Sequence, residues 1–180
     1  MSVKRWFKGK QKHILIWAVL LIYLFSANQL YIHFFLKNGK PLSTRVTLPA
    51  PSKDLVYKLA DMQVVQVDGE DLNEIKGYAF FPDEPELDTN ISIVLSSPTQ
   101  QYVFPTNSVA YPNMIESYPN YTPGMSGDEF SMLISKNVIK PGRYKIGILV
   151  EEQDGNRRSY VLTGSIIQKT PNTIQYMAGP

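Results

Sequence analysis

An uncharged apolar run near the N-terminus constrains the fold of this chain more than any other feature. From Ile14 to Leu36 there are 23 residues without a formal charge, and 14 of them are Leu, Ile, Val or Phe. As a helix that rises about 1.5 Å per residue, this run is about 35 Å long, enough to cross a hydrocarbon core about 30 Å thick. The sequence therefore predicts one transmembrane helix over residues 14–36.

The charges that flank this run predict its orientation. The first 13 residues contain no acid and five basic residues, Lys4, Arg5, Lys8, Lys10 and Lys12. Because basic flanks stay in the cytoplasm, residues 1–13 are expected to be a cytoplasmic segment, with the C-terminal bulk in an extracytoplasmic position at the cell membrane. A cleaved secretory signal is the alternative, since a basic start followed by the 12 apolar residues 14–25 has the proportions of one.

Composition excludes several function classes. All 16 acids lie from Asp54 onward, whereas seven of the 18 basic residues lie at or before Lys40, so the two parts carry net charges of +7 and −5. An acidic exterior is not suited to bind nucleic acid. The chain has no cysteine, and its two histidines, His13 and His33, lie at the membrane segment. A Ser-His-Asp triad, a thiolate site or a histidine metal site is therefore excluded outside, and we expect no cofactor.

The rest of the chain has the pattern of an all-β domain. Residues 37–53 contain three prolines and few large apolar groups, which predicts an extended linker. Residues 54–169 alternate in hydrophobicity, and residues 170–180 are expected to be a flexible tail. The segments expected to form strands are Leu55–Val67 with a bend near residue 60, Leu72–Phe81, Ile91–Ser96, Gln101–Phe104, Glu129–Ile134, Arg143–Glu151 and Arg158–Gln168.

Turn residues separate these strands. Asp68-Gly69, Ser97-Pro98-Thr99 and Asp154-Gly155-Asn156 each have the residue types of a tight turn. Lys140-Pro141-Gly142-Arg143 has Pro and Gly at its two central positions, which predicts a type II turn. Within Leu72–Phe81, the face that bears Tyr78 and Phe80 is expected to meet the core. Short strands with such turns predict an immunoglobulin-like β-sandwich of about seven strands, preceded by the one N-terminal transmembrane helix.

Several of these segments carry a family resemblance. The sequence resembles small extracytoplasmic β-sandwich domains of membrane-anchored bacterial envelope proteins, some of them linked with surface-polysaccharide assembly. The resemblance rests on residues 76–80, 91–95, 102–104 and 139–148. It is incomplete in the middle, where the family pattern has a basic-Pro-Asp segment and this chain has Ala110-Tyr111-Pro112-Asn113. It implies an accessory role and no catalytic residues.

The candidate binding residues lie in two places. Tyr111, Tyr118 and Tyr121 alternate with prolines in the long connection 105–128, where they form a stacking platform for sugars or a docking site for a protein, or else pin the loop to the sandwich. Asn28, Gln29 and His33 lie at membrane depth. Amides there pair helices through hydrogen bonds, and snorkelling or local pairing is the alternative for His33.

Two further motifs favour structural interpretations. The acidic run Asp83, Glu84, Glu86 and Asp88 has the ligand chemistry of a calcium site or a glycosidase pair, but without EF-hand spacing it is expected to be a solvated loop. Ser135-Lys136 permits a Ser-Lys dyad only as an adjacent pair. We expect the chain to have no enzymatic activity. The hypothesis is a non-catalytic, membrane-anchored envelope protein whose sandwich binds a protein or glycan partner. The alternatives are a serine and lysine hydrolase and a structural subunit recognised through its anchor.

Overall fold

The computed structural model describes residues 16–23, 27, 30, 34–60, 62–82, 89–108, 129–152 and 155–179. The chain divides into two compact units, Met1–Phe34 and Phe35–Pro180. In the first unit, residues 16–23 are helical and their large apolar side chains are exposed, from 44% at Leu20 to 71% at Tyr23. Within the described parts of the chain, no helix combines the length and the apolar character needed to span a membrane.

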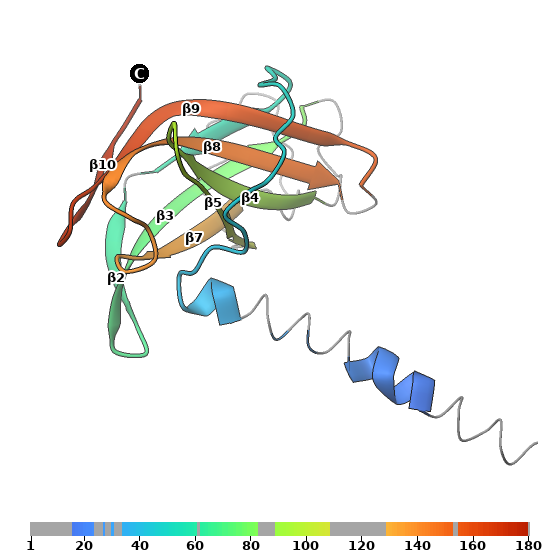
Figure 1. The fold of residues 1–180 in the computed structure, drawn as a ribbon. Coiled ribbons are helices and arrows are strands. Elements are labelled where there is room, and N and C mark those ends of the chain that lie inside the picture. The colour runs from blue at the N-terminus through green and yellow to red at the C-terminus, as the bar shows by residue number, and fades with distance from the viewer. Residues whose placement is uncertain are drawn as a thin grey trace, which may run out of the picture. The chain divides into compact units, whose positions relative to one another are not determined.

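The second unit is all-β, as predicted. Its described residues form two antiparallel sheets, coloured from teal to red in Figure 1. The first sheet has the strand order β1-β3-β7-β6, with β2 also paired to β3, and its strands are β1 (Val56–Leu59), β2 (Gln63–Val67), β3 (Glu70–Phe80), β6 (Asn107–Ser108) and β7 (Glu129–Ser135). The second sheet has the order β10-β9-β8-β4-β5, and its strands are β4 (Thr89–Ser96), β5 (Gln101–Pro105), β8 (Gly142–Glu152), β9 (Arg158–Lys169) and β10 (Ile174–Met177).

Alternation along the strands places one core between the two sheets. The fully buried side chains of this core come from β3, β7, β4, β5, β8 and β9, among them Ile75, Met132, Ile93, Phe104, Ile148 and Ile167. Along each strand, every second side chain points to the same face, and two sheets whose inner faces share one core form a β-sandwich. The β-sandwich prediction is therefore confirmed.

The prediction for the faces of β3 is wrong. The shared core takes Ile75, Ala79 and Phe81, whereas Tyr78 and Phe80 point to the other face. Both aromatic residues are nevertheless buried there, with ring centroids 6.1 Å apart. The alternation of residues assigned the side chains to the two faces correctly. Because both faces of this strand carry buried apolar side chains, the pattern did not show which face meets the second sheet.

The predicted hairpins are confirmed, and so are the turns at residues 68–69 and 97–99. Asp154 of another expected turn lies outside the described residues. The type II geometry expected at residues 140–143 is wrong, because Gly142 does not have the positive φ that this turn requires. Asp68 and Gly69 both have positive φ, 53° and 83°, which is the geometry of a type I′ hairpin turn between β2 and β3. The segment expected as one bent strand forms β1 and β2, which pair with different parts of β3. The expected hairpins appear as β4 with β5 and β8 with β9.

Residues 40–53, here called the strap, lie within the expected linker and are extended, but they are bound to the sandwich. The strap begins on the edge of β5, where Leu42 N–H donates to the Val103 carbonyl (2.7 Å) and Val103 N–H donates to the Ser43 carbonyl (2.8 Å). It ends on β9, where Ser52 N–H donates to the Tyr160 carbonyl (2.8 Å). In Figure 1 the strap crosses in front of β4 and β8.

The strap covers a second, smaller apolar cluster on the outer face of the β4-β5-β8-β9 sheet. Val94, Val103, Leu149 and Tyr160 are buried there, and the strap residues Val46 and Leu48 pack against them. Such an outer face would otherwise be open to water. The domain that folds together therefore includes residues that the sequence analysis assigned to the linker.

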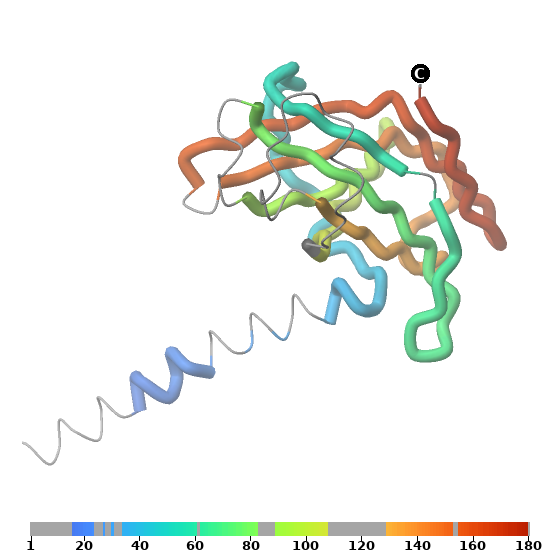
Figure 2. The backbone as a smooth tube through the Cα atoms, turned by 180° about the vertical axis from the view of Figure 1, so that it is seen from behind, coloured from blue at the N-terminus to red at the C-terminus, as the bar shows by residue number. Residues whose placement is uncertain are grey.

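Residues 170–180 also differ from the expected flexible tail. Thr170 N–H donates to the Thr173 carbonyl (2.9 Å) around Pro171-Asn172, and the chain returns as β10 antiparallel to β9. Ile174 and Tyr176 of β10 pack against the main core. Viewed from behind in Figure 2, β10 lies beside β9 at the edge of the sheet. This strand was not among those expected from the sequence.

Candidate functional site

Most of the candidate residues from the sequence lie outside the described residues: Tyr111, Tyr118 and Tyr121, the membrane-depth residues Asn28, Gln29 and His33, and the acidic run 83–88. The strand ends that flank the two long connections can be placed, because Glu129 pairs with Tyr78 whereas Ser135 pairs with Leu72. Both connections therefore leave the sandwich at the end opposite Ser135.

The chain enters the domain at the end marked by Ser135. Helical residues 34–37 stop at Asn38-Gly39, where Gly39 has a φ of 58° and Lys40 N–H donates to the Phe35 carbonyl (3.1 Å). This is the Schellman pattern of a helix C-terminus. Ser135 N–H donates to the Gly39 carbonyl (3.0 Å), and a Cβ on Gly39 would lie 2.6 Å from that nitrogen. Only glycine fits this close approach.

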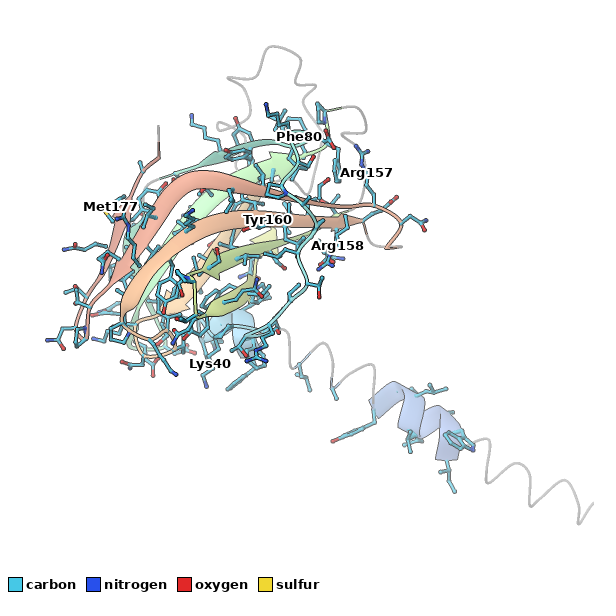
Figure 3. The ribbon with its side chains drawn as sticks, turned by 45° about the horizontal axis from the view of Figure 1, so that its top comes forward. Lys40, Phe80, Arg157, Arg158, Tyr160 and Met177 are labelled. Carbon is cyan, nitrogen blue, oxygen red and sulfur yellow. The ribbon has the colours of Figure 1, made fainter. Side chains whose placement is uncertain are left out.

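A polar hollow of about 740 Å³ opens at this entry end. It is lined by three segments that are distant in sequence: the strap residues 44–45, the β4–β5 turn with its flanks (residues 96–102), and the β7–β8 turn (residues 137–140). In Figure 3, Lys40 marks the entry end and Arg157 the opposite one. The hollow is therefore on the opposite end of the domain from Ser108 and Glu129, the strand ends that flank the tyrosine-rich connection.

Gln100, Tyr102 and Lys140 line the hollow, and they are hydrogen-bonded to one another and to Tyr144 in a group here called the floor. The Tyr102 hydroxyl donates to Gln100 Oε1 (3.0 Å), and the Tyr144 hydroxyl lies 2.8 Å from both that oxygen and the Lys140 carbonyl. Lys140 N–H donates to the Tyr102 hydroxyl oxygen (3.3 Å), and the two tyrosine rings meet edge to face, 5.7 Å apart. These bonds connect the β4–β5 turn to the β7–β8 turn, so the floor is fixed.

The rim of the hollow is held by side chains that close its turns. Ser97 Oγ accepts from Gln100 N–H (3.0 Å) across the β4–β5 turn. Gln101 Oε1 accepts from Val46 N–H (2.6 Å) and so fixes the strap beside the hollow. Serine, threonine, asparagine and glutamine dominate the lining, with a cation at Arg45 and another at Lys140 and no carboxylate. Such a surface presents many hydrogen-bond donors and acceptors.

Comparison of the whole chain with protein-family models, with curated proteins and with solved structures gives no match. Function therefore has to be argued from the site itself.

Among the described residues there is no group of three or more His, Cys, Asp or Glu side chains placed to hold a metal ion. Ser135 Oγ, from the adjacent Ser135-Lys136 pair, is buried and accepts a long bond from Asn137 N–H (3.4 Å). What the arrangement offers is hydrogen bonding and positive charge, the chemistry of binding.

The floor has a consequence for stability at high pH. Burial raises the pKa of the Tyr144 phenol from 10.0 to about 12, and neighbouring Tyr102 adds to the rise. The folded protein therefore keeps a proton that the unfolded chain loses above about pH 10. The contribution to stability is complete below about pH 10, and we expect the free energy of unfolding to fall as pH rises from about 10 to about 12.

Denaturant titrations at about pH 8 and about pH 11 measure this slope. Tyr144→Phe should lose about 1 kcal/mol at neutral pH through its hydrogen bonds, yet its stability should fall less between the two pH values. Some slope should remain, because burial also raises the pKa of Tyr160. Identical slopes in the two proteins would contradict the assignment.

Proposed function

We propose that this chain is a single-pass membrane protein with a cytoplasmic N-terminus, and that its extracytoplasmic β-sandwich binds a glycan partner without catalysis. The polar hollow is the observation that carries the glycan part of the proposal. Its lining combines hydroxyl and amide side chains on a rigid floor. A hydrated, hydroxyl-rich ligand needs many such groups in fixed positions, whereas a protein partner is usually held by an apolar centre.

Two observations support the membrane part. The basic, acid-free flank at residues 1–13 precedes an uncharged run of 23 residues. In that run the side chains of residues 16–23 are exposed, including Trp17 at 64% and Ile22 at 66%. Large apolar side chains that extend into solvent on all sides of a helix favour a lipid environment.

The strand order supports an immunoglobulin-like arrangement. The order β1-β3-β7-β6 corresponds to the A-B-E-D sheet of that fold, and the order β9-β8-β4-β5 corresponds to its G-F-C-C′ sheet. The segments that carry the resemblance to envelope proteins fall mainly on β3, β4, β5 and β8. We therefore propose an accessory role in the synthesis or export of a surface polysaccharide. Tyr111, Tyr118 and Tyr121 remain a prediction of a second contact.

Binding of the intact protein in mild detergent to a glycan array tests the proposal. We expect at least one glycan to bind, and the double variant Thr99→Ala with Asn137→Ala to bind it about 10-fold to 100-fold more weakly, because two hydrogen bonds of about 0.5–1.5 kcal/mol each are lost. Both residues are exposed, so the fold should be unaffected. Asn90→Ala, exposed near the far end of β4, is the matched control. No bound glycan, or equal binding by the double variant, would contradict the proposal.

A further inference from the structure

We propose that the polar hollow selects acidic saccharides, which carry a carboxylate or a phosphate, over neutral ones. This inference rests on the proposed function and names the class of its ligand. It follows from where the charges of the domain lie. The sequence after Lys40 contains 11 basic and 16 acidic residues, so the domain as a whole is acidic. The segments around the hollow have the opposite balance.

No acid occurs in the three segments that line the hollow. The acids of the strands that continue them, Glu129, Glu151 and Glu152, lie at the far ends of β7 and β8. Residues 34–53 and 130–150 contain basic residues and no Asp or Glu, and residues 89–108 contain no charged residue at all. In the hollow itself the charged residues are Arg45 and Lys140. An acidic domain thus presents a hollow of positive charge, which attracts anions.

The backbones of the two cationic residues are fixed while their side chains are exposed. Ser43 Oγ donates to the Arg45 carbonyl (2.9 Å) and accepts from the Arg45 N–H (3.1 Å). Lys140 is held on both sides, by its N–H on Tyr102 and by its carbonyl, which accepts from Tyr144. Fixed backbones reduce the entropy lost when the two side chains bind a ligand.

Some other cations of the domain have an anionic partner. Lys37 pairs with Asp68 (2.7 Å) and Arg158 with Glu151 (2.6 Å). Among the residues that the structure describes, no carboxylate pairs with Arg45 or Lys140. A guanidinium binds a carboxylate or phosphate through two parallel hydrogen bonds, and an ammonium adds a point charge. Both groups are therefore available to an acidic sugar.

The uncharged part of the lining favours a saccharide over a lipid surface. Ser97, Thr99 and Asn137 surround the cations, and the apolar Ile139 is buried. Binding to a membrane surface depends on exposed apolar groups together with several cations. Hydroxyl and amide groups around a cation instead match a sugar that carries both hydroxyls and an acidic group.

Calorimetric titration of the intact protein in neutral detergent tests this inference. The probes are oligogalacturonates and phosphorylated mannan oligosaccharides, each beside a neutral galactan or mannan oligosaccharide of equal length. We expect at least one acidic probe to bind 10-fold or more tighter than its neutral counterpart, and raising the salt from about 0.05 M to about 0.5 M to reduce the difference. Arg45→Gln with Lys140→Gln should abolish the preference but keep binding to the neutral sugar.

Two controls keep the result interpretable. Arg45→Lys with Lys140→Arg preserves the charges and should retain most of the preference, whereas Lys58→Gln, exposed on β1 of the other sheet, should change nothing. Equal binding of acidic and neutral probes would overturn the inference and leave the proposed function standing. Binding of no saccharide would overturn both, and binding only to vesicles of phosphatidylglycerol would assign the charge to lipid headgroups instead.

Discussion

A fragment of residues 54–180 is expected to unfold or aggregate under conditions in which residues 35–180 fold cooperatively. The shorter fragment lacks the strap and leaves the outer cluster of Val94, Val103, Leu149 and Tyr160 without cover. Full burial of such a side chain contributes about 1.5–3 kcal/mol, so uncovering four of them in part costs on the order of 5 kcal/mol. This is similar to the total stability of a small domain, about 5–15 kcal/mol.

Denaturant unfolding and binding of a hydrophobic dye measure the difference between the two fragments. Within residues 35–180, Val46→Ala with Leu48→Ala should lower the free energy of unfolding by about 2–4 kcal/mol, because both side chains are half-buried against the cluster. Thr47→Ala is the matched control. Its side chain is exposed and its carbonyl, which accepts from Arg158 Nη1 (2.9 Å), is kept. Equal stability of residues 54–180 and 35–180 would show that the strap is only a linker.

The strands of the sandwich could be predicted because their signals are local. Asp68-Gly69 and Ser97-Pro98-Thr99 fix hairpins through the chemistry of two or three residues, and alternation then marks the strands on either side. The β10 strand was missed, although Pro171-Asn172 is a turn signal of the same kind. The following residues are few, and their burial depends on the edge of β9.

The strap could not be predicted, because its position is decided by residues far away in the sequence. Prolines and small polar residues are typical of a linker, and they equally suit an extended segment bound to a sheet. The surface that the strap covers depends on Gly147, where a Cβ would overlap the ring of Tyr160. Because Gly147 has no side chain, this ring can lie against the Gly147 backbone, in the cluster that Val46 and Leu48 cover.

The hollow could not be predicted either, because it too is formed by residues that are distant in the sequence. Its residues come from three segments, and each segment by itself has the composition of a solvated turn. Tyr102 and Tyr144 lie on strands, so their patterns predict burial without revealing the hydrogen bonds that join them through Gln100. A long connection with several tyrosines attracted attention instead, because its composition is unusual.

We propose a folded sandwich that residues 14–36 hold outside the membrane. The accessibility of introduced cysteines tests this topology most directly. Because the chain has no cysteine, one introduced residue is the only thiol. Asn172→Cys lies in the exposed β9–β10 turn, and Ser2→Cys lies in the basic N-terminal segment. A membrane-impermeant maleimide added to intact cells should label Asn172→Cys fully. Ser2→Cys should be labelled only after the cells are permeabilised.

The intact mass of the labelled protein completes the measurement. Retention of the N-terminal residues, together with resistance to extraction by alkaline carbonate, would confirm an uncleaved anchor and exclude a cleaved signal. Protection of Asn172→Cys in intact cells, or labelling of both positions only after permeabilisation, would contradict the proposed topology.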